Sequence, residues 1–141
     1  MQIAFSIILA GVAAIFGSGE FEVPVAQQWL LDKRADEQSI SLIRLISTPE
    51  SFDGKYVSVQ GYLVLRDRYE HSLFLDENSY KEGQTANSIA IDLGGSSVEI
   101  VAHAKERDRQ YVVVTARFSV GGSAFSEGRL EGVYRLFSLG D

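Results

Sequence analysis

The clearest pattern in the chain is an alternation of apolar and polar positions over residues 55–66. Successive side chains of a β-strand point to opposite faces, so this pattern predicts a long strand with one buried face. The preceding Asp53-Gly54 pair is typical of a turn. Gly61 takes an inward position, where a glycine predicts a bulge or a sharp bend. The expected inward side chains are Val57, Val59, Leu63 and Leu65, and the expected outward ones are Tyr56, Ser58, Gln60 and Tyr62.

Four further segments have strand character: residues 71–76, 88–93, 110–120 and 129–139. The sequence QYVVVTARF in the fourth strand resembles KYVSVQGYL in the first. Each has a tyrosine, then β-forming residues, then a small residue at the same offset, which is Gly61 or Ala116. We therefore expect these two strands to lie side by side. In the last strand, Gly132 marks a second position for a bulge.

Helical patterns are short and surround these strands. Residues 26–34 (AQQWLLDKR) have helical composition. We expect Trp29 there to be a core anchor or a lid on the domain, with ligand contact as the alternative. A second helix is expected up to residue 47, capped by Ser39 or Ser41 and ended by Thr48-Pro49. Its buried face is either Ile43 with Ile46, or Leu42 with Leu45 and Ile46.

Two more helical segments lie between strands. Residues 78–83 predict a single turn capped by Asn78 and ended by Gly83. Residues 98–107 predict a helix between the third and fourth strands, with Val98, Val101 and Ala102 on its apolar side.

The element order is strand, strand, strand, helix, strand, strand, which is the order of the OB-fold. We predict a mainly β domain: a five-stranded OB-like barrel with a short helix between strands 3 and 4 and with N-terminal helices. The first strand should pair with both the second and the fourth, which closes the barrel. Another small barrel, or an open β-sandwich with a packed helix, is the alternative.

The first residues are different in character. Residues 3–16 (IAFSIILAGVAAIF) are apolar or small, and every charged side chain of the chain follows them. This length is short for a membrane span but suits a signal peptide, with small residues at 17–19 for cleavage. We predict a signal peptide over 1–19, an extension with a short helix over 20–38 and the barrel over 39–141. The protein would then be periplasmic or secreted; an uncleaved N-terminal anchor or a buried core helix remain alternatives.

The amino-acid composition limits the functions that we expect for this chain. Thirteen basic against nineteen acidic side chains give a net charge of −6, which disfavours nucleic acid as a partner. There is no cysteine, and the two histidines, His71 and His103, belong to no metal-binding or hydrolase motif. We therefore expect no metal, cofactor or catalytic site. The expected function is an exported, non-enzymatic binding or interaction module for a protein or small ligand. A single-stranded nucleic-acid binder and, less favoured, a hydrolase are the alternatives.

An OB barrel would bind a ligand on the face of its second and third strands, between the loops that follow the first and fourth strands. Aromatic and arginine side chains in these places could stack on bases or sugars and hold phosphates. The alternative is that the arginines pair with acidic neighbours on a solvated rim and that the outward tyrosine packs against the N-terminal helices. The candidate residues are Tyr62, Arg66, Arg68, Tyr69, His71, Arg117, Phe125 and Arg129.

Three stretches carry a resemblance to known proteins: ISLIRLISTPESFDGKYVSVQGYLVL, SLFLDENSYKEGQTANSIAIDL and QYVVVTARF with GRLEGVYRL. They resemble a group of small, mostly uncharacterised bacterial proteins with OB-like barrels, many of which are predicted to be exported. More loosely, residues 52–61 are similar to the tRNA_anti-like OB domains, in the turn Phe52-Asp53-Gly54-Lys55 and the strand motif that ends at Gly61. The resemblance covers roughly residues 39–138. It implies the fold, and it implies nucleic-acid binding by fold analogy alone.

Overall fold

The computed structural model describes residues 37–67, 71–121 and 128–139. The expected signal peptide over 1–19 and the helix expected over 26–34 lie outside the described residues. In the described part of the chain, no helix is long and apolar enough to cross a membrane.

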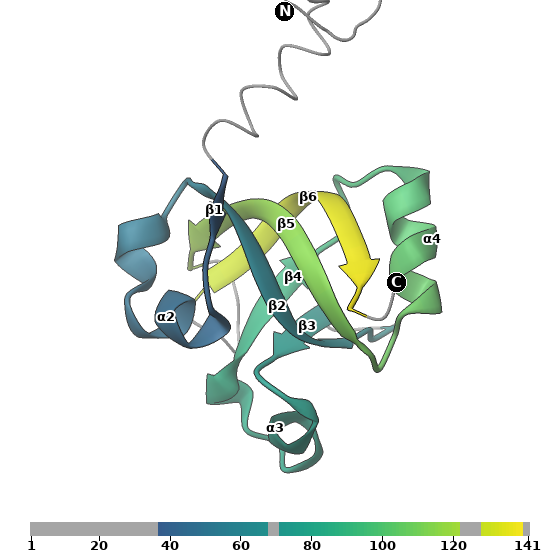
Figure 1. The fold of residues 1–141 in the computed structure, drawn as a ribbon, viewed down its shortest axis with the longest axis horizontal. Helices are drawn as coiled ribbons and strands as arrows, with labels where there is room; N and C mark the ends of the chain where they lie inside the picture. Colours follow the sequence, from purple (N-terminus) through teal and green to yellow (C-terminus); the bar gives the residue numbers. More distant parts are fainter. Residues whose placement is uncertain (1–36, 68–70, 122–127, 140–141) are drawn as a thin grey trace, which may run out of the picture. The chain divides into compact units, whose positions relative to one another are not determined.

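The strands form a closed five-stranded barrel of the OB type, as the element order predicts (Figure 1). The strand β2 (Tyr56–Val64) pairs antiparallel with β3 (His71–Phe74) along one part and with β5 (Tyr111–Val120) along another. The strand β3 continues antiparallel into β4 (Ser88–Asp92), which lies parallel to β6 (Gly128–Ser138). Antiparallel pairing of β5 with β6 completes the barrel.

One strand was not anticipated. The short strand β1 (Gln38–Ser39) runs parallel to β2, with Gln38 opposite Val57 and Ser39 opposite Ser58. The amide of Ile40 extends this contact by donating a hydrogen bond to the Ser58 carbonyl, with N and O 3.0 Å apart. The segment before the first helix is therefore attached to the edge of the barrel.

The sequence likeness of β2 and β5 corresponds to direct pairing. The two strands are antiparallel, and Gly61 lies opposite Val112 while Ala116 lies opposite Val57. Each small residue thus faces the first inward valine of the other strand. The expectation that these strands lie side by side is confirmed.

Gly61 is not the site of a bulge, which is one of the two roles predicted for it. The register between β2 and β5 runs through it without a shift, so there is no bulge at this position. A Cβ atom on Gly61 would instead lie 2.5 Å from Leu73 Cγ and 2.8 Å from the Phe74 carbonyl oxygen. Glycine is needed here because Leu73 and Phe74 of the neighbouring strand β3 lie too close to the backbone of β2 for a Cβ atom to fit.

The predicted irregularity in the last strand is present. The register of β5 with β6 shifts between Thr115, which faces Arg135, and Arg117, which faces Glu131. Gly132 lies in this bulge with a φ of 61°, a conformation that side chains disfavour.

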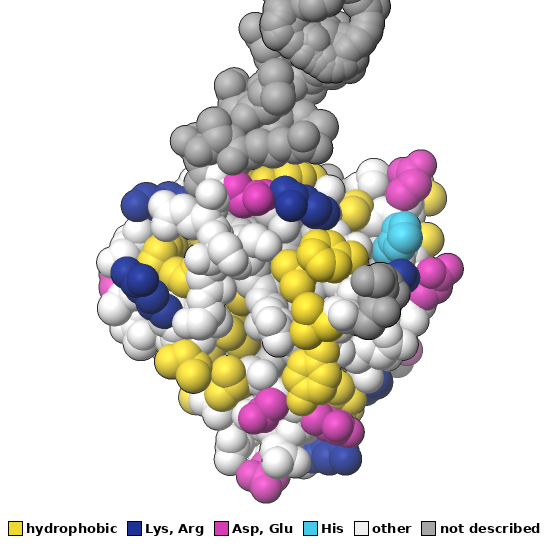
Figure 2. All heavy atoms as spheres, in the orientation of Figure 1, with side chains coloured by type: hydrophobic (Ala, Val, Ile, Leu, Met, Phe, Trp, Pro, Cys, Tyr) yellow, Lys and Arg dark blue, Asp and Glu magenta, His cyan; other side chains and the backbone are white. Residues whose placement is uncertain are grey.

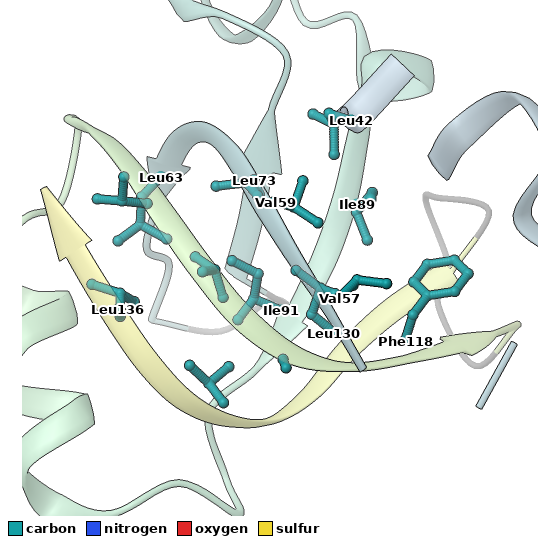
Figure 3. Close-up of a cluster of buried hydrophobic side chains, with 14 of the residues drawn as sticks. Leu42, Val57, Val59, Leu63, Leu73, Ile89, Ile91, Phe118, Leu130 and Leu136 are labelled. Atoms are coloured by element: carbon teal, nitrogen blue, oxygen red, sulfur yellow. The ribbon is translucent and has the colours of Figure 1, made fainter. Parts of the chain in front are cut away.

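The barrel interior is a continuous apolar core (Figure 3). Inward side chains of all five barrel strands meet there, and the alternation predicted for β2 is correct. The helix α2 (Leu42–Ser47) and the 3-10 turn η2 (Pro49–Phe52) add further apolar side chains. The fully enclosed members include Leu45, Val57, Val59, Leu63, Leu73, Ile89, Ile91, Val112, Val114, Phe118 and Leu130.

The helices begin and end close to the expected positions, with two corrections. Ser41 caps α2, and Leu42 and Leu45 form its buried face. The helix α3 (Glu77–Lys81) is capped by Asp76 and not by Asn78, because the Asp76 carboxylate accepts the Ser79 amide hydrogen at an N–O distance of 2.8 Å. A 3-10 turn, η3 (Thr85–Asn87), follows and leads into β4.

The helix α4 (Val98–Glu106) is capped by Ser97 and lies between β4 and β5, as predicted. Its buried side includes Val101, as expected, but not Val98 or Ala102, which are exposed. Ala104 is fully buried and Ile100 and Val101 pack against the core, whereas the Val98 side chain is 82% exposed.

Candidate functional site

The outward side chain of Tyr62 is buried and does not offer a stacking surface. It is 6% exposed and packs with Val64 and Phe74 into a small apolar cluster, separate from the barrel core, beside α3. Tyr80 of α3 packs on this cluster, with its ring centroid 6.0 Å from that of Tyr62 and 5.5 Å from that of Phe74. Burial raises the pKa of the Tyr62 hydroxyl above its ordinary value. Tyr62 therefore anchors α3 to the barrel.

Arg66 and His71 hold the two ends of the loop between β2 and β3. The Arg66 amide donates a hydrogen bond to His71 Nδ1, with the two nitrogens 3.0 Å apart. The Arg66 guanidinium donates to Ser72 Oγ and lies 5.9 Å from the centre of the Phe74 ring. Burial, with the nearby positive charge of Arg66, lowers the pKa of His71. An uncharged imidazole is needed because Nδ1 accepts a hydrogen bond.

Arg117 and Arg129 meet on the carboxylate of Glu131. Arg117 Nη1 lies 2.9 Å from Glu131 Oε1, and Arg129 Nη2 lies 3.2 Å from Glu131 Oε2. The three side chains share the outer face of β5 and β6, where Arg117 is opposite Glu131 in the ladder. An anionic ligand would have to compete with this carboxylate for both guanidinium groups.

The candidates thus form two groups on the barrel wall. Ala90 of β4 lies opposite Ser72 of β3 and opposite Arg129 of β6, so the groups are two strand spacings apart, about 10 Å. Arg68, Tyr69 and Phe125 lie outside the described residues. Arg117 and Arg129 thus pair with Glu131, whereas Arg66 bonds Ser72 and lies over the Phe74 ring. Tyr62 is buried.

A third polar cluster was missed from the sequence. The Glu37 carboxylate accepts a hydrogen bond from the Tyr134 hydroxyl, at an oxygen–oxygen distance of 2.8 Å, and pairs with Arg135. Burial and this hydrogen bond raise the pKa of Tyr134 to about 12. Because Glu37 immediately precedes β1, the cluster ties the β1 segment to β6. Nothing in the local sequence links residues so far apart.

The outer face of β5 and β6 also carries an apolar patch, which we define as Tyr111, Val113, Phe137 and Leu139. Val113 lies opposite Phe137, and the Leu139 amide donates to the Tyr111 carbonyl oxygen at 3.2 Å, so the four side chains share one face. Tyr111, Phe137 and Leu139 are 39%, 40% and 48% exposed. Figure 2 shows hydrophobic side chains gathered over β5 and β6 on this face.

The sequence contains a signal for this patch. Residues 111–114 (YVVV) are apolar at every position, so the strand has apolar side chains on both faces. The inward set, with Val112 and Val114, fills the barrel, and the outward set remains at the surface. The predicted site, which was placed at the loops that follow the first and fourth strands, does not include this patch.

A groove of about 470 Å³ lies beside the patch, and Val113 belongs to both. Its walls come from the β1–α2 segment, from Ser58 and Gln60 of β2, and from Leu75 after β3. Its side chains are uncharged. Ile43 of α2, one of its lining residues, is 61% exposed.

Within residues 37–67, 71–121 and 128–139, no three histidine, cysteine or carboxylate side chains gather in a way that could hold a metal ion. No model of a known protein family matches the sequence. No curated protein matches it either.

One similar solved structure is described as an aspartyl-tRNA synthetase from Leishmania major Friedlin. It is 12% identical, with a TM-score of 0.44, and the match covers 79% of this chain and 25% of that chain. This chain therefore spans about a quarter of the length of the protein it matches. At this level of similarity the comparison carries no inference about function, and the OB-like fold rests on the strand order and pairing described above.

Proposed function

We propose that this chain is a non-enzymatic binding module that holds a protein partner against the apolar patch. The observation that carries the proposal is the gathering of exposed Tyr111, Phe137 and Leu139 with Val113 on one face of paired strands. Contiguous exposed apolar side chains mark interaction surfaces in soluble proteins. Aromatic side chains also contribute strongly to binding energy at such surfaces.

The patch is held in place before a partner arrives. The Tyr111 ring packs edge-on against Tyr62 with centroids 5.2 Å apart, and its hydroxyl accepts the Glu77 amide hydrogen at 3.0 Å. Val113 and Phe137 are fixed by the ladder between β5 and β6. A surface that is already ordered loses little conformational entropy on binding, which favours affinity.

Charge also favours a protein partner over nucleic acid. None of the four patch side chains is charged, the whole chain carries −6, and Arg117 and Arg129 are engaged by Glu131. Binding to phosphates depends on basic side chains that can neutralise them. The nearby aromatic rings of Tyr62 and Phe74, at 6% and 1% exposure, present almost no face for a base to stack on.

We further propose that the module acts outside the cytoplasm of a bacterium. The support is the apolar run at 3–16 with small residues at 17–19, together with the resemblance to small exported bacterial OB-like proteins. N-terminal sequencing of the native protein from fractionated cells tests this part. A chain that begins near Glu20 in the periplasmic fraction is expected, and an intact Met1 in the cytosol would refute it.

A photo-crosslinking scan in the cells that make the protein tests the binding surface. A photoreactive phenylalanine analogue at position 137 or 139 should give a discrete cross-linked protein. The same analogue at position 98 is the matched control, since Val98 is 82% exposed on α4 and outside the patch. Equal cross-linking from all three positions, or none from 137 and 139, would refute the proposal.

Single-stranded oligonucleotides test the competing function. We expect no measurable binding to the full chain at low salt. Tight binding that weakens steeply as salt is added would establish the nucleic-acid alternative instead.

A further inference from the structure

The groove beside the patch borders an incompletely paired edge of β2. On this edge, β1 pairs with Val57 and Ser58, and β3 pairs with residues 62–64. Among the residues that the structure describes, residues 59–61 therefore have a ladder partner only on the β5 side. The gap between β1 and β3 lies at Gln60, which is also a lining residue of the groove.

The main-chain direction at Gln60 follows from its neighbours. The Ser58 carbonyl points to the β1 side, where it accepts the Ile40 amide hydrogen. The Leu63 amide and carbonyl point to the β5 side, where they bond Gln110 and Arg109. In a β-strand the N–H and C=O of one residue point to the same side, and successive residues alternate between the two sides. Both groups of Gln60 therefore point to the same side as those of Ser58, towards the groove. A main-chain donor and acceptor are thus presented next to the apolar side chains of Ile40, Ile43 and Leu75, which also line the groove.

We propose that this groove binds an extended, uncharged peptide segment of a partner. One apolar side chain of the segment enters between Ile40, Ile43 and Leu75, and its main chain bonds the N–H and C=O of Gln60. This is the way in which peptides recognise open sheet edges: main-chain hydrogen bonds align the peptide, and a pocket selects a side chain. The volume of about 470 Å³ is within the range of small-ligand sites.

The residues that line the groove determine which side chain of a bound peptide the groove can accommodate. The apolar part of the lining, which includes Ile40, Ile43 and Leu75, favours an aliphatic side chain, and none of the lining side chains is charged to pair with a buried charge. The hydroxyls of Ser41 and Ser58 already accept hydrogen bonds, from the Arg44 amide and from Thr115 Oγ1. The Gln60 main chain offers a donor and an acceptor on one side of the strand, the arrangement that an extended peptide can match.

The inference rests on the proposed protein-binding function, because it names the part of the partner that binds. Apart from the shared Val113, however, the groove residues lie outside the patch. Ile43 lines the groove and lies outside the patch, whereas Phe137 belongs to the patch and does not line the groove. Substitutions at the two positions therefore test the two proposals independently.

The experiment titrates the isotope-labelled full chain with the neutral peptide acetyl-SVLVS-amide and follows backbone amide signals by NMR. We expect saturable shifts for Gln60, Ser39 and Ile43. The charged peptide acetyl-SVDVS-amide should bind at least tenfold more weakly. N-methylation of the central leucine, which removes its N–H donor, should weaken binding at least threefold.

Variants locate the site. Ile43→Glu should weaken peptide binding at least tenfold, whereas Val98→Glu, also an aliphatic-to-acid change at an exposed helix position, should not alter it. Phe137→Glu should leave binding in the groove unchanged even if it abolishes cross-linking at the patch. Equal binding of the charged peptide, shifts confined to the patch, or shifts that appear only as the chain associates with itself would each overturn the proposal.

Discussion

Replacing Gly61 with alanine tests the account of the barrel at its tightest point. The new Cβ atom would lie 2.5 Å from Leu73 Cγ and 2.8 Å from the main-chain oxygen of Phe74. Carbon atoms pack best at about 3.5–4.0 Å, so Leu73 must move by about 1 Å or more. The Leu73 side chain can adjust only against a core in which it is fully buried, and the Phe74 oxygen is fixed by the β2–β3 ladder.

The expected loss of stability follows from two opposing effects. Overpacking of a well-packed core costs about 1–3 kcal/mol. Alanine also lowers the conformational entropy of the unfolded chain, which offsets about 0.4–1 kcal/mol of this cost. The net prediction is a decrease of about 1–2 kcal/mol in the free energy of unfolding. For a domain of this size, that lowers Tm by about 5–15 °C.

Urea and thermal unfolding, followed by circular dichroism, measure this change. Gly95→Ala is the matched control, because a Cβ atom there would meet no atom within 4 Å and the φ of Gly95 is not positive. The control should unfold at the wild-type midpoint or slightly above it. If Gly61→Ala is as stable as the control, the close approach of β2 and β3 does not explain the glycine.

Three further predictions concern the polar contacts. The pKa of His71 is lowered in the folded state, so the contribution of His71 to stability is fully present above about pH 6.5, its pKa in the unfolded chain. That contribution is lost as the pH falls through the pKa of the folded state. Between about pH 7 and 5, the free energy of unfolding of His71→Gln should therefore fall less than that of the wild type. Glu37→Gln removes the charge beside Tyr134 and Arg135, so the pKa of Tyr134 should fall from about 12. Ultraviolet titration of tyrosinate measures this pKa, and an unchanged value would contradict the contact between Glu37 and Tyr134. Ser97→Ala removes the cap of α4 and should lower the free energy of unfolding by about 1 kcal/mol in urea melts, whereas no change would show that the cap contributes nothing.

The architecture could be predicted because the sequence carries local signals for it. Alternation in β2 separates the core face from the outer face, and the likeness of KYVSVQGYL to QYVVVTARF indicates a pair of strands. The role of Gly61 could not be predicted in the same way. A glycine in a strand is consistent with a bulge or with a close approach, and only the position of Leu73 on the neighbouring strand decides between them.

The binding surfaces were harder to predict, because the state of an outward side chain depends on distant residues. Tyr62 is outward as expected but is covered by Tyr80 of α3, and Arg117 is held by Glu131 across the ladder. The patch and the groove arise where segments far apart in sequence meet: Tyr111 with Leu139, and Ile43 with Val113. Such surfaces follow from tertiary pairing, which periodicity within one segment does not specify.

The central claim, that the apolar patch binds a protein, is tested most directly by comparing partner affinity between two variants. The protein cross-linked at position 137 would be purified and titrated calorimetrically into the wild type, Phe137→Glu and Arg129→Gln. The account predicts at least a tenfold loss of affinity, about 1.4 kcal/mol, for Phe137→Glu and wild-type affinity for Arg129→Gln. Full affinity of Phe137→Glu, with a loss for Arg129→Gln, would contradict it and place the binding surface at the arginines instead.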